Sequence, residues 1–191
     1  MDIKITYPSP KKQRVRREAF LAIAKWPMIA ATIICPVINF LVGGKAWSVI
    51  VLMGLYMVWT LAFSIDLVEY NRISQCIKYT FQICIMLVLI DVCLVSGWAS
   101  FVVPIVAFVG LSLAVILFLT DISRQKQNLF PILTFIAFSF VGAAIAAYFY
   151  EGYTRLVFAI TSAMALVWLI VCISVLGADF LRELKRRFHI K

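Results

Sequence analysis

The chain has 191 residues, of which 64% are hydrophobic and only 14% are charged, whereas globular domains average about 45–50% apolar and about 25% charged residues. This composition excludes an ordinary soluble fold and predicts an all-α polytopic membrane protein. The formal net charge of +9 indicates membrane topology and attraction to anionic lipid headgroups. Nucleic-acid binding is not expected, because no basic surface interleaved with aromatic residues can be read.

Six apolar runs have the length of a membrane span, since a hydrocarbon core of about 30 Å needs roughly 20 helical residues. We expect them to form three hairpins in one transmembrane domain, 27–178, between a basic lead at 1–26 and a basic helical tail at 179–191. The connections are too short to hold a soluble catalytic module. The predicted spans are 27–44, 47–67, 78–97, 101–120, 129–149 and 154–178.

The basic residues are unevenly divided between the two sides of these spans. Sixteen of the 18 Lys and Arg residues precede the first span, follow the second or fourth, or end the chain, and only Lys45 and Arg155 fall on the other side. By the positive-inside rule, both termini are expected in the cytoplasm of a bacterial plasma membrane.

The segment 11–26 joins good helix formers to basic residues just before Pro27. It can lie in the headgroup plane as an amphipathic helix that Pro27 turns into the bilayer, or it can extend the first span into the cytoplasm. The sequence leaves both alternatives open. The residues expected to contact anionic lipid are Arg14, Arg16, Arg17, Lys185, Arg186 and Arg187.

Three short turns are predicted on the outer side, around Trp47, Trp98 and Tyr153. Their spacing is compatible with an internal triplication, although any six-span bundle with short connections has a similar spacing. Asn39 lies near the outer end of the first span and provides a hydrogen-bonding group there.

Asp91 is the most informative single residue, because it lies in an otherwise apolar span, where a carboxylate costs several kcal/mol unless it is neutralised or paired. Its neighbours three and four residues away are all apolar, so we expect a partner from another span. Three interpretations stay open: a structural pair with Arg155 or Asn39, a solute or lipid-headgroup site, and a proton-coupled site. The expected outward-facing polar pocket comprises Asp91, Asn39, Arg155, Lys45, Thr161 and Ser162.

The fifth span carries small residues at four-residue spacing, a pattern that lets helix backbones approach closely. We expect this face to pack against another helix of the same bundle, with a homodimer interface as the alternative. The residues concerned are Gly142, Ala143, Ala146 and Ala147.

Neither a metal nor another cofactor is expected from the reactive side chains. His189 is the only histidine and lies near the C-terminus, and no two of the five cysteines have the spacing of a redox or zinc motif. We interpret the cysteines as small apolar residues.

Three blocks of sequence carry a resemblance: 47–52 (WSVIVL), 89–91 (LID) followed by 97–105 (GWASFVVPI), and 181–189 (LRELKRRFH). They resemble an uncharacterised family of six-span integral membrane proteins from Firmicutes. Members of that family often begin with a cytoplasmic zinc ribbon, two cysteine pairs ahead of a Tyr-Pro and a basic stretch. This sequence has Tyr7-Pro8 and the basic stretch without the cysteines, so the resemblance carries over no zinc-dependent role.

Two functions of different classes are compatible with these features. The first is a non-enzymatic accessory subunit that binds lipid or a protein partner. The second is a solute-binding or transport protein around Asp91, similar in size and span count to the substrate-binding subunits of energy-coupling vitamin transporters. A membrane enzyme is the weakest interpretation, because the sequence shows no catalytic set of residues away from the cytoplasmic boundary.

Overall fold

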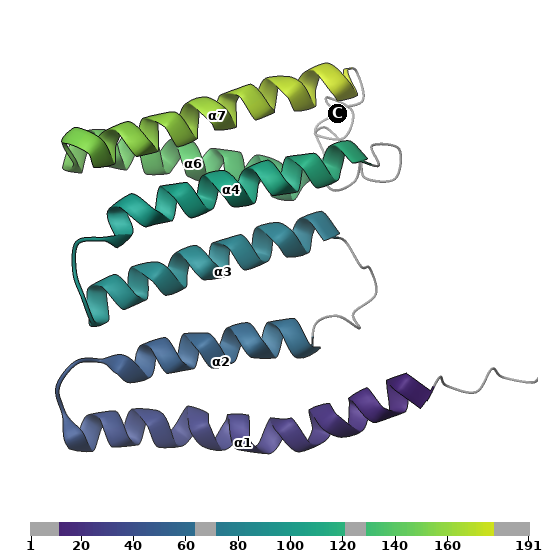
Figure 1. Ribbon diagram of the computed structural model, residues 1–191, viewed down its shortest axis with the longest axis vertical. Coiled ribbons are helices and arrows are strands. Elements are labelled where there is room, and N and C mark those ends of the chain that lie inside the picture. The colour runs from purple at the N-terminus through teal and green to yellow at the C-terminus, as the bar shows by residue number, and fades with distance from the viewer. Residues whose placement is uncertain (1–11, 64–71, 121–128, 178–191) are drawn as a thin grey trace, which may run out of the picture. The chain divides into compact units, whose positions relative to one another are not determined.

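The computed structural model describes residues 12–63, 72–120 and 129–177, and every regular element in these ranges is an α-helix (Figure 1). The predicted all-α class is therefore confirmed for this part of the chain. The helices are α1 (Lys12–Val42), α2 (Trp47–Phe63), α3 (Arg72–Cys93), α4 (Ala99–Thr120), α6 (Leu129–Phe149) and α7 (Gly152–Leu176).

Five of these helices are long and apolar enough to cross a membrane: all except α2. The apolar stretch of α2 runs from Trp47 to Leu61, and its predicted end at residue 67 lies outside the described residues. The predicted spans 101–120, 129–149 and 154–178 differ by at most two residues at either end from α4, α6 and α7. The largest differences are at the first and third spans.

The chain divides into two compact units, Met1–Leu67 and Val68–Lys191. The described part of the first unit is a hairpin of α1 and α2. Helix α1 has 31 residues and continues through Pro27 and Pro36, so it measures about 46 Å and exceeds a hydrocarbon core of about 30 Å. The segment before Pro27 is thus helical and continuous with the span, and both alternatives for its place at the membrane stay predictions.

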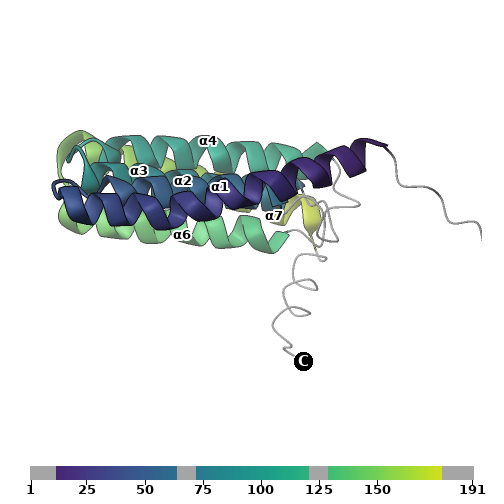
Figure 2. The ribbon, with the colours of Figure 1, turned by 90° about the horizontal axis from the view of Figure 1, so that it is seen from below.

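The described part of the second unit is a bundle of α3, α4, α6 and α7 in which α4 contacts the other three helices. Figure 1 shows α3, α4 and α7 side by side with α6 behind α4 and α7, and Figure 2 shows α4 and α6 on opposite faces. We call the end of this unit with the connections 94–98 and 150–151 the turn end, and the opposite end the loop end.

The buried core of the second unit lies toward the loop end. It combines the beginnings of α3 and α6 with the ends of α4 and α7. Fully or almost fully buried there are Ile73, Ile77, Leu111, Ala114, Val115, Phe118, Ile132, Phe135, Ile136, Ala165, Cys172 and Leu176.

Helices α3 and α4 approach each other closely at Gly110. A Cβ atom at this position would overlap the side chain of Thr80, so only glycine fits without a shift of one helix. The Thr80 hydroxyl donates a hydrogen bond to the carbonyl of Cys76 in its own helix, 2.9 Å away. The contact between Gly110 and Thr80 sets how α3 and α4 align along their length.

Candidate functional site

Asp91 lies in the last turn of α3 and holds the connection to α4. Its Oδ1 atom accepts hydrogen bonds from the backbone amides of Gly97, Trp98 and Ala99, at 2.8, 2.8 and 3.0 Å. The first amides of a helix have no partner within that helix, and a side-chain oxygen that accepts from them stabilises the helix start. The carboxylate of α3 thus caps the beginning of α4.

This arrangement depends on where α3 ends. The predicted span continued to residue 97, whereas α3 ends at Cys93, which brings Asp91 two residues from the helix end instead of six. Gly97 has a φ of +110°, a conformation that side chains with a Cβ rarely adopt. The reversal at Gly97 points the next amides back toward the carboxylate.

Asn39 has a similar role in the first unit, where its side chain bonds to the turn before α2 and to the start of α2. Its Oδ1 atom accepts from the amide of Ser48 at 2.9 Å, and its Nδ2 atom donates to the carbonyl of Lys45 at 3.2 Å. Both bonds close the turn between α1 and α2, and the Asn39 side chain is buried. A polar residue near the end of one helix therefore satisfies the start of the next helix in two hairpins of the chain.

The third described hairpin lacks this device. Glu151 occupies the cap position before α7 but makes no side-chain capping hydrogen bond. The amide of Tyr150 donates to the carbonyl of Ala146, 3.0 Å away, which is a bond of the last turn of α6. The similarity between hairpins is thus limited to the first two.

Within the described part of the second unit, no hydrogen bond joins Asp91 to the other residues of the expected polar pocket. Among the described residues, the hydrogen bonds of Asp91 come from backbone amides and none comes from Arg155, which is exposed near the start of α7. Asn39 and Lys45 belong to the other unit, so their pairing with Asp91 stays a prediction.

Thr161 and Ser162, next to each other on α7, differ in what their hydroxyls contact. The Thr161 hydroxyl donates to the carbonyl of Val157 at 2.9 Å and also lies 3.2 Å from the carbonyl of Pro104 on α4. The Ser162 hydroxyl bonds only within α7, to the carbonyl of Ala159 at 2.9 Å. Thr161 therefore joins two helices, whereas Ser162 does not.

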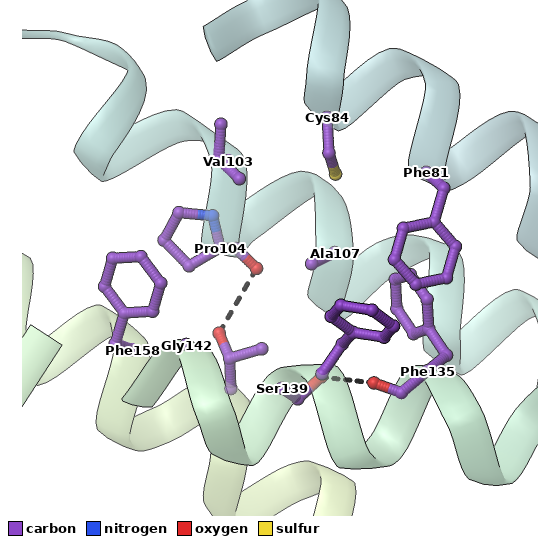
Figure 3. Close-up of a pocket in the computed structure, with 11 residues that line it drawn as sticks. Phe81, Cys84, Val103, Pro104, Ala107, Phe135, Ser139, Gly142 and Phe158 are labelled. Carbon is purple, nitrogen blue, oxygen red and sulfur yellow. Dashed lines mark hydrogen bonds between the residues drawn. The ribbon is translucent and has the colours of Figure 1, made fainter. Parts of the chain in front are cut away.

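An apolar crevice between the four helices of the second unit is the structural feature that the sequence did not indicate (Figure 3). Its volume is about 160 Å³. Four phenylalanines from three helices surround it, and the Cys84 side chain points into it from α3 (Figure 3). The lining residues are Phe81, Cys84, Val103, Pro104, Ala107, Phe135, Phe138, Ser139, Gly142, Phe158 and Thr161.

Edge-to-face ring contacts hold one wall of this crevice. The ring of Phe81 lies 4.7 Å from that of Phe135 and 5.0 Å from that of Phe138, at interplanar angles of 81° and 78°. Such pairs are favoured geometries for aromatic rings. The wall between α3 and α6 is therefore formed by three phenylalanine rings in edge-to-face contact.

The small-residue face of α6 contributes to the opposite wall. Gly142 lines the crevice, and a Cβ atom there would lie 3.4 Å from the ring of Phe158 on α7. Ala146 is buried, Ala143 is partly buried and Ala147 is exposed. Part of this face thus packs against α7 within the unit, in line with the first alternative from the sequence.

The residues expected to contact anionic lipid lie at the two ends of the chain. Arg14, Arg16 and Arg17 belong to the first turns of α1, and Lys185, Arg186 and Arg187 lie outside the described residues. Among the residues that the structure describes, no three His, Cys, Asp or Glu side chains come together in a way that could hold a metal ion.

Comparison with protein families gives a match over nearly the whole chain. The model of a family of unknown function, DUF6320, matches residues 7–190. The chain belongs to the DUF6320 family. The match covers all six described helices, so the Asp91 cap and the crevice lie within the segment that defines DUF6320. Searches of curated proteins and of solved structures found no significant match.

Proposed function

We propose that this DUF6320 protein is a non-enzymatic accessory subunit of the bacterial plasma membrane that binds membrane lipid. The observation that supports this proposal is how the chain uses its polar side chains. Asp91, Asn39 and Thr161, which the sequence offered as a polar site, all bond to the chain's own backbone. The cavity among the helices is instead lined by apolar groups.

The proposed topology has six spans and both termini in the cytoplasm. Helix α2 supplies the sixth span: its 17 described residues cover about 25 Å, and the predicted continuation to residue 67 completes the crossing. The asymmetry of basic residues orients the chain. The basic first turns of α1 extend beyond the span Leu21–Val42, on the side that the positive-inside rule assigns to the cytoplasm.

The cytoplasmic ends are the proposed contact with anionic headgroups. A basic side chain near the surface of an anionic leaflet contributes about 1 kcal/mol to binding. Arg14, Arg16 and Arg17 sit on a helix that is continuous with a span. An accessory role also requires a protein partner in the membrane, or a second copy of the chain.

Solute binding at Asp91 is the second candidate, and one observation favours it. The Oδ1 atom is committed to three amides, whereas among the described residues no hydrogen bond to Oδ2 is found, and the side chain is partly exposed at the turn end. That oxygen could accept from a cationic or hydroxylated solute. The commitment of Oδ1 to the turn places this candidate below lipid binding.

Cysteine accessibility tests the proposed topology. In a variant without the five native cysteines, single cysteines at Ser96 and Tyr153 should react with a membrane-impermeant maleimide added to intact cells. Cysteines at Ser123 and Lys191 should react only after the cells are opened. Labelling of Lys191→Cys from outside would contradict the proposed orientation.

Headgroup binding is tested by neutralising the basic ends. Replacing Arg14, Arg16 and Arg17 by Gln should weaken retention of phosphatidylglycerol relative to phosphatidylcholine, as measured by native mass spectrometry of protein released from nanodiscs. Each lost charge should cost about 1 kcal/mol at low ionic strength. Unchanged selectivity for phosphatidylglycerol in this variant and in its Lys185, Arg186 and Arg187 counterpart would contradict headgroup binding by these ends.

A further inference from the structure

The crevice of the second unit has the size of a small apolar ligand. Its volume is about 160 Å³, and an apolar protein cavity of about 150 Å³ stays dry and accepts a molecule the size of benzene. Room of this size fits part of one hydrocarbon chain.

The two hydroxyl groups in the lining, those of Ser139 and Thr161, already donate their hydrogen bonds within the chain. The hydroxyl of Ser139 donates to the carbonyl of Phe135 at 3.1 Å, and that of Thr161 donates to Val157. Among the described residues, no buried side-chain nitrogen or oxygen lacks a partner. A polar solute or water in the crevice would therefore find few partners for its hydrogen bonds, which costs free energy, whereas a hydrocarbon would lose none.

The depth of the crevice determines which apolar molecules reach it. Pro104 lies five residues from the start of α4 at Ala99, and Phe158 lies six residues from the start of α7 at Gly152. At 1.5 Å per residue these positions are roughly 8 and 9 Å below the turn end. Since α3, α4, α6 and α7 are all long and apolar enough to cross a membrane, the surroundings at this depth are lipid acyl chains.

The core and the crevice lie in different parts of the bundle. Close packing of Leu111, Phe118 and Leu176 fills the loop end, while the crevice lies from the middle of the helices toward the turn end. A chain that enters the crevice is therefore stopped by the core below it and keeps its headgroup at the turn end.

We propose that the crevice between α3, α4, α6 and α7 holds a segment of one acyl chain from a membrane lipid whose headgroup lies at the turn end. This inference rests on the proposed lipid-binding function and specifies a second mode of it, recognition of the chain instead of the headgroup. The ligand class is a linear hydrocarbon chain. The aromatic wall of Phe81, Phe135 and Phe138 forms one side of the site.

The experiment measures retained lipid in variants that fill the crevice. The wild-type chain is reconstituted in nanodiscs of dioleoylphosphatidylcholine, whose neutral headgroup separates chain binding from attraction to the basic ends, and the lipids that stay bound after release are counted by native mass spectrometry. Ala107→Phe fills the crevice from α4. Ala163→Phe makes the same substitution at an exposed position of α7 and is the matched control.

The wild type and the Ala163→Phe variant should each retain one phosphatidylcholine, and Ala107→Phe should retain none. If Ala107→Phe fails to fold by circular dichroism, Gly142→Leu, which fills the crevice from α6, decides the test in its place. Equal retention by the filled variant and the control would overturn the inference. Failure of the wild type to retain any phosphatidylcholine would overturn it as well, while leaving headgroup binding by the basic ends intact.

Discussion

The Oδ1 atom of Asp91 in the last turn of α3 lies 3.0 Å from the backbone nitrogen of Ala99, the first residue of α4. The same oxygen also accepts from the amides of Gly97 and Trp98. The charge that first suggested a ligand site thus joins two helices through the turn between them. Substitution of Asp91 should therefore lower the thermal stability of the protein.

Replacing Asp91 by Asn and by Leu should separate capping from charge. Asn keeps an oxygen that accepts from the amides but loses the stronger, charge-assisted bonds, so the apparent unfolding temperature should fall slightly. Leu removes the acceptor and leaves three amides without it, so the fall should be larger. Thermal unfolding in detergent measures both. Wild-type stability of Asp91→Leu would contradict the capping role.

Loss of the Asn39 side chain should destabilise the hairpin of α1 and α2. Asn39→Ala removes one accepted and one donated hydrogen bond at a buried position, which should cost about 1–2 kcal/mol. Proteolysis in detergent should show cleavage at the turn between α1 and α2 at lower protease concentration than in the wild type. A cleavage pattern unchanged at every concentration would show that the turn does not depend on this side chain.

Two glycines that face neighbouring helices should respond differently to alanine. Gly110→Ala places a methyl group against Thr80 and should cost about 1–3 kcal/mol through overpacking. Gly142→Ala meets only the Phe158 ring at 3.4 Å and should stay within about 1 kcal/mol of the wild type. Guanidinium or detergent-induced unfolding of both variants compares them. Equal stability of the two variants would contradict the close approach of α3 and α4 at Gly110.

Thr161 and Ser162 are a natural pair for testing the link between α4 and α7. Thr161→Val keeps the shape of the side chain but removes the hydrogen bond to Pro104, and bonds of this kind contribute about 0.6 kcal/mol in membrane proteins. Ser162→Ala removes a bond within α7 alone and should change little. Thermal unfolding of the two variants in parallel gives the comparison, and a larger loss in Ser162→Ala would argue against the interhelical bond.

The sequence predicted the helices well where apolar runs are bounded by strong signals. The connection Gly43-Gly44-Lys45 placed the start of α2 correctly at Trp47, and the ends of α6 were predicted without error. It failed where a boundary depends on tertiary contacts. The run from Asp91 to Gly97 is apolar enough to continue a helix, and only the amides that converge on Asp91 show why α3 ends at Cys93.

The candidate site was harder to predict, for a related reason. Composition indicates which residues are polar, but it does not show whether a hydroxyl or carboxylate is already used by the backbone, as it is at Asp91 and Thr161. The crevice consists of phenylalanines, and phenylalanines are present on both packed and lipid-facing surfaces of membrane helices. Their positions on three helices relative to Gly142 become informative only in three dimensions.

We assign a structural role to Asp91 and lipid binding to the crevice. One comparison of two variants tests both assignments together. Lipid retained by Asp91→Asn and by Ala107→Phe is counted by native mass spectrometry after release from the same dioleoylphosphatidylcholine nanodiscs. We expect Asp91→Asn to keep one bound lipid and Ala107→Phe to lose it. Loss of the lipid in Asp91→Asn, with retention in Ala107→Phe, would contradict the account and return the binding site to Asp91.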